Sequence, residues 1–156
     1  MKYIIPVFIT IVLLNFFSFS QEKNSQKFFR VCGTMTGYLP RQTIYLGVYA
    51  SQQQFKTRQV FRRLRFLPDL VTADSLPFCF DSLPPGEYII AGYQDTNRDR
   101  HINMGWRGPR EPYCFHKEQR GILPPGFNRN KFMINSSIDT LHLRFTLPAK
   151  NIGAKN

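Results

Sequence analysis

Apolar and polar residues alternate along much of this chain, and that period of two limits the fold more than any other feature. In FFRVCGTM, residues 28–35, Phe29, Val31 and Met35 alternate with other side chains, and LHLRFTL, residues 141–147, repeats the pattern. Such alternation gives a β-strand one apolar face, which must be buried against a second layer. No window of a dozen residues shows a clean helical stripe with caps. The sequence therefore predicts a fold made of half-buried strands.

Turn residues separate the strand candidates. LPFCFDS (76–82) and EYIIAGYQ (87–94) flank LPPG, where proline presets φ and glycine tolerates positive φ, so we expect two strands joined by a tight turn. TIYLGVYA (43–50) and the shorter KFMINSS (131–137) are further candidates. The best helical candidate is FKTRQVFRRLRF (55–66), with room for a turn or two of basic helix. Several short strands separated by Pro/Gly turns favour an all-β fold, a single antiparallel β-sandwich.

The first twenty residues carry the features of a secretory signal. Lys2 precedes an apolar stretch, and a small-x-small site, Ser18 to Ser20, precedes Gln21. The apolar stretch falls short of the roughly 20 residues that span a bilayer. We therefore expect a secreted or periplasmic protein with no transmembrane segment after signal cleavage. The expected divisions are a signal peptide at 1–20, a polar leader at 21–27, a β-sandwich domain at 28–149 and a polar tail at 150–156.

Basic residues outnumber acidic residues two to one. The chain has 21 Lys and Arg against 10 Asp and Glu, a formal net charge of +11, and signal cleavage would remove only Lys2 from this count. A basic surface attracts polyanions, although net charge alone also serves solubility. The expected partner is an anionic envelope polysaccharide, a lipid head group or another envelope protein. We expect no specific nucleic acid.

Three cysteines, Cys32, Cys79 and Cys114, fall in the expected mature protein. In an oxidising compartment they allow one disulfide with one thiol left over, and the sequence leaves the pairing open. Their spacings of 47 and 35 residues match neither a zinc site nor a redox pair.

Several motifs follow one another in an order that resembles a known family. DSLPPGEYIIAGYQDTNRDRHINMGWRGPREPYCF is followed by GILPPGFNRNKFMI and a final alternating strand. The series is similar to domain-of-unknown-function family 2141, with its signatures F-x-D-L-P-P-G-x-Y-A-x-x-x-x-H-D-x-N-x-N-G-x-[LI]-D and G-[IL]-P-x-E-x-Y-G-F-S. The resemblance runs roughly from Phe28 to Leu147. Gln94 stands in place of the family's histidine, and Arg100 in place of its loop glycine.

The resemblance implies a fold without implying an established activity. The family's expected architecture is a transthyretin-like or carboxypeptidase-regulatory-like sandwich. We therefore predict a transthyretin-like or immunoglobulin-like β-sandwich of about seven strands. A transthyretin-like fold also hosts a purine-catabolic hydrolase, but fold analogy alone does not transfer an activity.

The loop after the fifth strand candidate begins like a calcium loop. Oxygen-bearing residues recur at alternate positions, as in D-x-[DN]-x-[DN]-G. Position six is Arg100, without the conformational freedom of glycine, and position twelve is Trp106, which has no carboxylate. Any calcium site would therefore be weak. Its candidate ligands are Asp95, Asn97, Asp99, His101 and Asn103.

We favour a second interpretation of this loop, an Asx-turn. Asp95 and Asn97 would cap backbone amides, and Asp99 would pair with a neighbouring arginine, Arg98, Arg100 or Arg107. In this interpretation the carboxylates offset the loop's positive charge and need no metal.

The aromatic residues divide into two groups. Phe29, Phe78, Phe80 and Phe145 fall on the inward phase of strands and are assigned to the core. A second group lies beside arginines in the long loop, a composition that stacks on sugars or bases and pairs with phosphate or carboxylate. The alternative is that these rings pin the loop onto the sandwich edge. The candidate ligand-binding residues are Trp106, Arg107, Arg110, Tyr113 and His116.

No catalytic motif is present. The sequence lacks a Gly-x-Ser-x-Gly elbow and a His-Glu-x-x-His pair, and its three histidines have no partner that marks a nucleophile or a zinc site. We predict an exported, non-enzymatic binding or accessory module of the cell envelope with no cofactor. The sequence leaves its ligand open, with an anionic ligand as one candidate. The first alternative is a calcium-stabilised module that uses the loop 95–103. The second is a small transthyretin-like hydrolase.

Overall fold

The structure is a computed structural model that describes residues 27–106, 108–117 and 126–148. The predicted signal peptide, the polar leader up to residue 26 and the polar tail lie outside the described residues. Within the described ranges, no helix has the length and hydrophobicity needed to cross a membrane.

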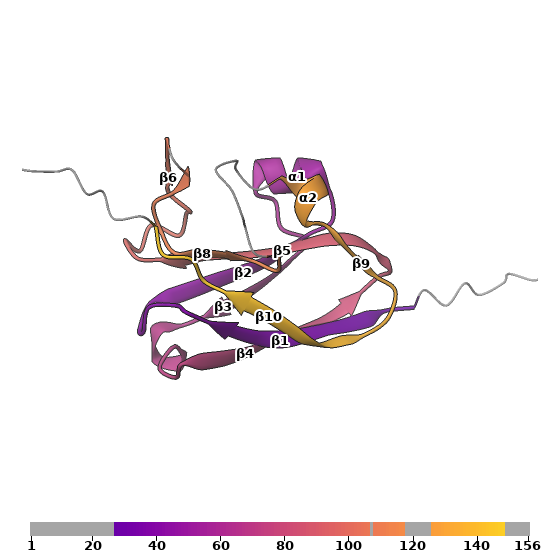
Figure 1. The fold of residues 1–156 in the computed structure, drawn as a ribbon, viewed down its shortest axis with the longest axis horizontal. Helices are drawn as coiled ribbons and strands as arrows, with labels where there is room; N and C mark the ends of the chain where they lie inside the picture. Colours follow the sequence, from indigo (N-terminus) through magenta and orange to yellow (C-terminus); the bar gives the residue numbers. More distant parts are fainter. Residues whose placement is uncertain (1–26, 107, 118–125, 149–156) are drawn as a thin grey trace, which may run out of the picture.

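Two sheets pack face to face (Figure 1). The three-stranded sheet has the order β10-β1-β4, with β1 at Phe29–Thr36, β4 at Ser75–Leu83 and β10 at Ile138–Arg144. Strands β1 and β4 are antiparallel, whereas β10 runs parallel to β1. The prediction of an all-β sandwich is confirmed, with one parallel pair in an otherwise antiparallel arrangement.

The second sheet has the order β3-β2-β5-β8. Its strands are β2 (Thr43–Tyr49), β3 (Arg62–Phe66), β5 (Gly86–Asp95) and β8 (Tyr113–Phe115), and β9 (Phe132–Ile134) pairs with the beginning of β5. Three short helices join these strands: α1 (Gln52–Thr57), the 3-10 helix η1 (Pro68–Leu70) and α2 (Phe127–Asn130). A separate hairpin consists of β6 (Met104–Gly105) and β7 (Gly108–Pro109). The hairpin and the two α-helices rise from opposite ends of this sheet (Figure 1).

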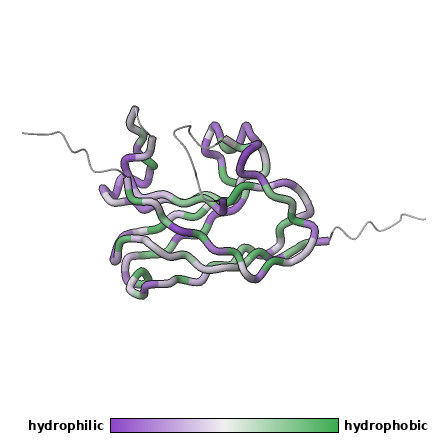
Figure 2. The backbone as a smooth tube through the Cα atoms, in the orientation of Figure 1, coloured by the Kyte–Doolittle hydropathy of each residue, from purple (hydrophilic) through white to green (hydrophobic). Residues whose placement is uncertain are grey.

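The core lies between the two sheets. Figure 2 shows hydrophobic and hydrophilic residues alternating along the strands, as the sequence pattern requires. The predicted core residues Phe78, Phe80 and Phe145 are buried, and Phe29 packs against the core from its edge. Fully buried side chains come from both sheets: Val31 and Met35 from β1, and Ile44, Leu46, Val48 and Ile90 from β2 and β5.

The helical candidate 55–66 is helical only at its start, over residues 55–57, and the prediction is wrong for the rest. Helix α1 begins earlier, where the Ser51 side chain accepts a hydrogen bond from the Gln54 amide, and it ends at Arg58, which adopts a left-handed φ of 60°. The second half of the segment forms β3 instead. There Leu64 lies opposite Leu46 in the sheet, so the alternation of arginine with apolar residues outweighs the basic helical pattern.

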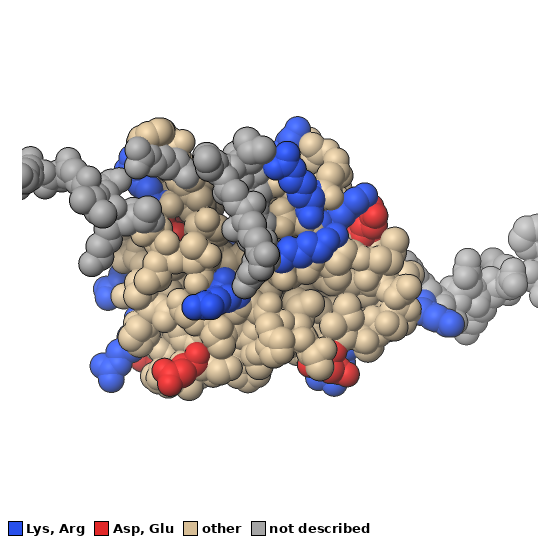
Figure 3. Space-filling view, viewed as in Figure 1, with Lys and Arg blue, Asp and Glu red and all other residues tan. Residues whose placement is uncertain are grey.

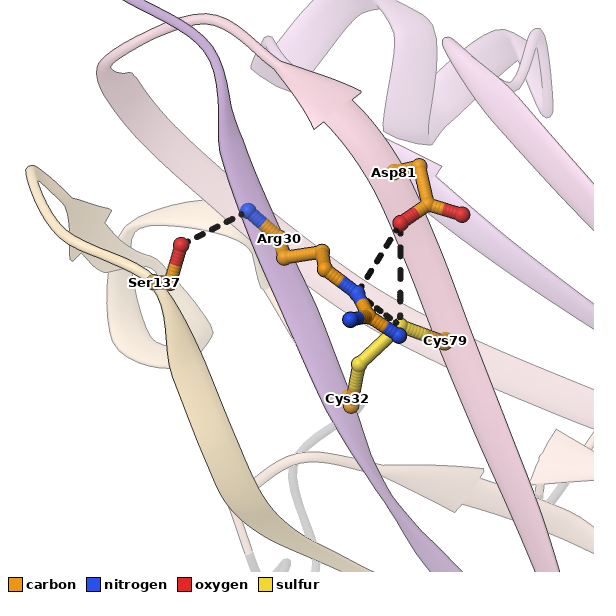
Figure 4. The surroundings of a disulfide bond; sticks show 5 residues. All are labelled: Arg30, Cys32, Cys79, Asp81 and Ser137. Atoms are coloured by element: carbon orange, nitrogen blue, oxygen red, sulfur yellow. Dashed lines mark hydrogen bonds and ion pairs between the residues drawn. A yellow bond between two sulfur atoms is a disulfide. The ribbon is translucent and has the colours of Figure 1, made fainter.

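A disulfide joins the two long strands of the three-stranded sheet. Cys32 in β1 and Cys79 in β4 lie directly opposite each other with a Cα–Cα distance of 4.0 Å. The Arg30 side chain lies beside the sulfur atoms and pairs with Asp81 at 3.1 Å (Figure 4). Cys114 is free and buried, and burial raises the pKa of its thiol. The expectation of one disulfide with one thiol left over is confirmed.

Candidate functional site

The candidate loop leaves the sheet at Asp95, the last residue of β5. Asp95 is only 3% exposed, and its Oδ2 accepts a hydrogen bond from the Arg100 amide at 3.1 Å. Its other oxygen, Oδ1, is buried and has no hydrogen-bond partner. Asp95 therefore closes the first turn of the loop with one oxygen and leaves the second unsatisfied.

Two Asx-turns follow. Asn97 Oδ1 accepts from the Asp99 amide at 3.3 Å, and Asp99 Oδ1 accepts from the His101 amide at 2.8 Å. Asp99 Oδ2 also accepts from the side-chain amides of Asn103 at 2.7 Å and Asn97 at 2.9 Å. These bonds lower the pKa of Asp99, and the bond from Asn103 contributes most. Within the described residues, Asp99 thus has amide partners where we expected a guanidinium group.

The backbone of the loop takes a path that usually requires glycine. Arg98 and Arg100 have left-handed φ angles of 67° and 65°. The carbonyl of Arg100 accepts from the Tyr93 hydroxyl at 2.8 Å, and its amide donates to Asp95. Arginine at the sixth position of the loop therefore does not prevent the turn, because these two bonds hold it on both sides.

Glu111 is a residue of this loop that the sequence reasoning missed. It is 3% exposed, and its Oε1 accepts from the Thr96 amide at 2.9 Å. Its Oε2 accepts from the Asn103 amide at 3.1 Å. Glu111 follows the β6–β7 hairpin and thereby connects it to both ends of the segment that contains the two Asx-turns. We call this segment, residues 96–103, the Asx-turn region. The signal that could have found it is the glutamate in the motif G-[IL]-P-x-E-x-Y.

The candidate metal ligands already bond one another and the backbone. The side-chain nitrogens of Asn97 and Asn103 face Asp99, and the amide of His101 donates to it. Within the described residues, no three or more His, Cys, Asp and Glu side chains form a group arranged to hold a metal ion. Calcium binding at this loop stays a prediction, and the unpartnered Oδ1 of Asp95 is the feature that keeps it open.

Gln94 has a structural role where the resembling family has histidine. Its side chain is fully buried. Its Oε1 accepts from the Leu39 amide at 2.7 Å, and its Nε2 donates to the Leu39 carbonyl at 2.8 Å. Through these two hydrogen bonds, Gln94 holds the β1–β2 connection against the end of β5.

The candidate ligand-binding residues lie in different parts of the fold. Trp106 is 86% exposed in the β6–β7 hairpin, and the Arg110 side chain packs near Gly105 in the same hairpin. Tyr113 lies in β8, where its ring contacts Phe115. Arg107 lies outside the described residues. The structure thus places Trp106 and the Arg110 side chain at the same hairpin and Tyr113 on the sheet.

His116 lies beyond β8 and away from the hairpin. Its amide donates to Ile90, and its ring packs 4.3 Å from the ring of Phe132. Both ring nitrogens are buried without a hydrogen-bond partner. Burial, with a smaller effect of nearby Lys117, lowers the pKa of His116 to about 4. The imidazole is therefore neutral at physiological pH.

A row of aromatic residues crosses the outer face of the second sheet. Strand register places Arg65, Tyr45, Tyr93 and Tyr113 directly opposite one another on β3, β2, β5 and β8. The rings of Tyr45 and Tyr93 stack with centroids 5.2 Å apart, and the Arg65 guanidinium lies 5.7 Å from the Tyr45 centroid. Burial raises the pKa of Tyr93, and nearby Asp95 adds to this effect.

A family model described as an uncharacterized protein conserved in bacteria, DUF2141, matches residues 40–141. The chain belongs to this family. The matched region contains the second sheet, β4, the Asx-turn region and Glu111, whereas all of β1 and the end of β10 lie outside it. The family resemblance expected from the sequence is confirmed. No curated protein and no solved structure matches the chain.

Proposed function

We propose that this protein is an exported, non-enzymatic binding module of the cell envelope and that its ligand is anionic. The observation that carries the proposal is an excess of cations without acidic partners. Ion pairs between described residues join only Arg30 to Asp81 and Lys131 to Glu87. Figure 3 shows blue side chains gathered near the α-helices, with a red group at the edge of this cluster. Uncompensated positive charge of this kind attracts and orients polyanions.

The non-enzymatic part of the proposal rests on the surroundings of the reactive side chains. Cys114 is buried, so its nucleophilic thiolate form is disfavoured. The imidazole of His116 has no hydrogen-bonded neighbour that could orient it or relay a proton. Asp95 and Glu111 accept hydrogen bonds from backbone amides and so support the loop.

Equilibrium binding tests the proposal. The mature protein is titrated with polygalacturonate, with anionic lipid vesicles and with two neutral controls, dextran and zwitterionic vesicles. We expect binding to an anionic probe that weakens as salt is raised, because screening reduces the attraction between exposed charges. Equal binding to neutral and anionic probes, or no binding to any of them, refutes the proposal.

Export has its own test. The predicted cleavage site before Gln21 means that the intact mass of the protein recovered outside the cytoplasm should lack residues 1–20. Recovery of a full-length chain from the membrane fraction would overturn this part of the proposal.

A calcium-stabilised module is the second candidate, and one observation favours it. Asp95 Oδ1 is buried without a partner at the start of a D-x-N-x-D sequence, where a cation would satisfy it. A ligand that binds only the folded state raises the melting temperature. Titration with calcium, with magnesium as control, should raise the melting temperature only if this second function is correct. A weak site of this kind would respond in the range of about 10⁻⁴ to 10⁻³ M.

A further inference from the structure

Three arginines converge on the outer face of the second sheet. Arg63 and Arg65 are two positions apart on β3, so their side chains leave the same face of the sheet. That face is opposite to the core, because the intervening Leu64 pairs with the fully buried Leu46. Arg58 approaches the same face from the end of α1.

Strand register places Arg63 opposite Gly47, between Tyr45 and Tyr49 on β2, and the electrostatics of two tyrosines agree with this position. Arg63 and Arg58 both lie close enough to the Tyr49 hydroxyl to lower its pKa, which burial raises. Arg63 acts in the same direction on Tyr93. Arg58 also donates from Nη1 to the Ile102 carbonyl at 3.3 Å, across the loop that folds over Tyr93. The three guanidinium groups thus border one aromatic surface, which we call the arginine–tyrosine face: Arg58, Arg63, Arg65, Tyr45, Tyr49 and Tyr93.

None of these arginines is neutralised. All three are exposed, and none forms an ion pair with a carboxylate in the part of the chain that the structure describes. The two carboxylates that act on Tyr93, Asp95 and Glu111, are buried and bonded to backbone amides. The charge on this face is therefore available to a ligand.

Edge protection is a competing explanation. β3 is an edge strand of its sheet, and charged side chains on edge strands prevent pairing with another chain. That role needs charge but no particular geometry. Here Arg65 stacks over Tyr45, while Arg63 stands near the hydroxyls of Tyr49 and Tyr93. The Tyr45 ring thus holds the Arg65 guanidinium in place, which a purely repulsive role does not require.

We propose that the arginine–tyrosine face binds an acidic polysaccharide through its carboxylate or sulfate groups. This inference rests on the proposed function and assigns it a site. A guanidinium group pairs with a planar carboxylate through two parallel hydrogen bonds, which ammonium cannot reproduce. Successive arginines on one strand face lie about 7 Å apart along the strand and so present a row of such donors to an extended chain. The half-buried Tyr93 borders this row with ring surface on which sugars pack.

Three double variants test the site with polygalacturonate as probe. Arg63→Ser/Arg65→Ser removes two cations from the face, and Arg63→Lys/Arg65→Lys keeps the charge without the paired donors. The control, Lys27→Ser/Arg144→Ser, removes two exposed cations from the other sheet, one just before β1 and one in β10. All four side chains are exposed, so each variant should melt like the wild type.

We expect the serine variant of the face to weaken binding at least about tenfold, the loss expected for one charge-assisted hydrogen bond. The lysine variant should fall between this variant and the wild type, and the control should change affinity about twofold or less. Equal losses in the face and control variants would overturn the assigned site while leaving the proposed function standing. If the lysine variant binds polygalacturonate as tightly as the wild type, recognition of carboxylates through two parallel hydrogen bonds is refuted.

The choice of ligand has a separate test. Polyphosphate, single-stranded DNA and anionic vesicles are measured beside polygalacturonate at one salt concentration. Tighter binding to any of these three would overturn the choice of polysaccharide. No binding of the wild type to any anionic probe would refute the proposed function itself, and the two failures are therefore distinguishable.

Discussion

Three buried polar side chains organise the end of the sandwich where β5 stops. Gln94 bonds to the backbone of the β1–β2 connection, and Asp95 bonds to the Arg100 amide inside the Asx-turn region. Glu111 bonds to the backbone amides at both ends of that region. A buried polar group must be paired, since an unpaired one costs about 1–3 kcal/mol. Their bonds fix the path of the loop, whereas the core between the sheets fixes the strands.

The substitution Asp95→Ala tests whether this loop depends on calcium. It removes the acceptor for the Arg100 amide, so we expect the free energy of unfolding to fall by about 1–3 kcal/mol. The loss should be the same with millimolar calcium and with chelator, measured by thermal melting. If the destabilisation disappears in chelator, the calcium-stabilised function is correct and ours is wrong.

His116 should make stability depend on pH. Its folded pKa of about 4 lies below the ordinary 6.5, so the unfolded chain binds the proton first as the pH falls. The folded state is therefore fully favoured above about pH 6.5 and loses stability progressively toward pH 4. We expect His116→Phe to flatten this part of the stability curve, because phenylalanine keeps the ring packed on Phe132 and does not titrate.

The control for this prediction is His142→Phe. His142 is exposed on β10 and lies outside the packing around Phe132, so the pH dependence that we assign to His116 should persist. Melting temperatures between pH 4 and pH 7 check both variants. An unchanged curve for His116→Phe contradicts the assignment.

At the scale of elements, Glu111 holds the β6–β7 hairpin against the Asx-turn region. Glu111→Gln replaces one acceptor oxygen by a donor that faces a backbone amide. We expect local opening, measured as faster tryptic cleavage of the native protein at the arginines of this loop. The matched control, Glu87→Gln, removes the same charge from an exposed ion pair with Lys131 and should leave the cleavage rate unchanged.

The disulfide is the second feature that holds elements of the fold together. It closes a loop of 47 residues between β1 and β4. Chain-entropy arguments give such a cross-link about 4 kcal/mol of stabilisation. We expect Cys32→Ala/Cys79→Ala to lose stability of this order in denaturant unfolding, and Cys32→Ala alone to leave Cys79 free. A loss below about 1 kcal/mol would show that the sheet holds β1 and β4 together without it.

Most of the strands that the sequence predicted correctly have enough residues to show a period; the exception is the three-residue β9, which lies inside the candidate 131–137. β1, β2, β4, β5 and β10 each have seven or more residues, and their apolar faces alternate. β8 has three residues and β6 and β7 two each, too few for any periodicity. β3 alternates over five residues but follows a helical start, so the sequence pattern favoured the wrong element there.

The same argument separates the parts of the candidate site. The Asx-turns could be predicted because their bonds join residues two positions apart, such as Asn97 and Asp99. Glu111 reaches Thr96 across 15 positions, and the arginine–tyrosine face combines three strands and the end of α1. Such contacts depend on register and strand order, which the residue pattern alone does not determine.

At the scale of the whole molecule, the basic side chains and the apolar core occupy different regions. The core cluster draws buried residues from both sheets, while the basic side chains lie on their outer faces and on the loops. Uncompensated surface charge slightly opposes the compact state and promotes association with anions. Ligand binding and folding are therefore coupled: an anionic ligand that binds the folded protein should raise its melting temperature.

The shared core predicts that both sheets unfold together. Leu143 belongs to β10 in one sheet and Ile90 to β5 in the other, and both are essentially fully buried in a single cluster. We expect Leu143→Ala and Ile90→Ala each to destabilise the protein by about 2–5 kcal/mol, because each leaves a cavity in that cluster. Far-UV and near-UV circular dichroism should follow one transition in each variant, since neither sheet keeps a buried face without the other. Two separate transitions, with only one displaced by each substitution, would mean that each sheet folds on its own core.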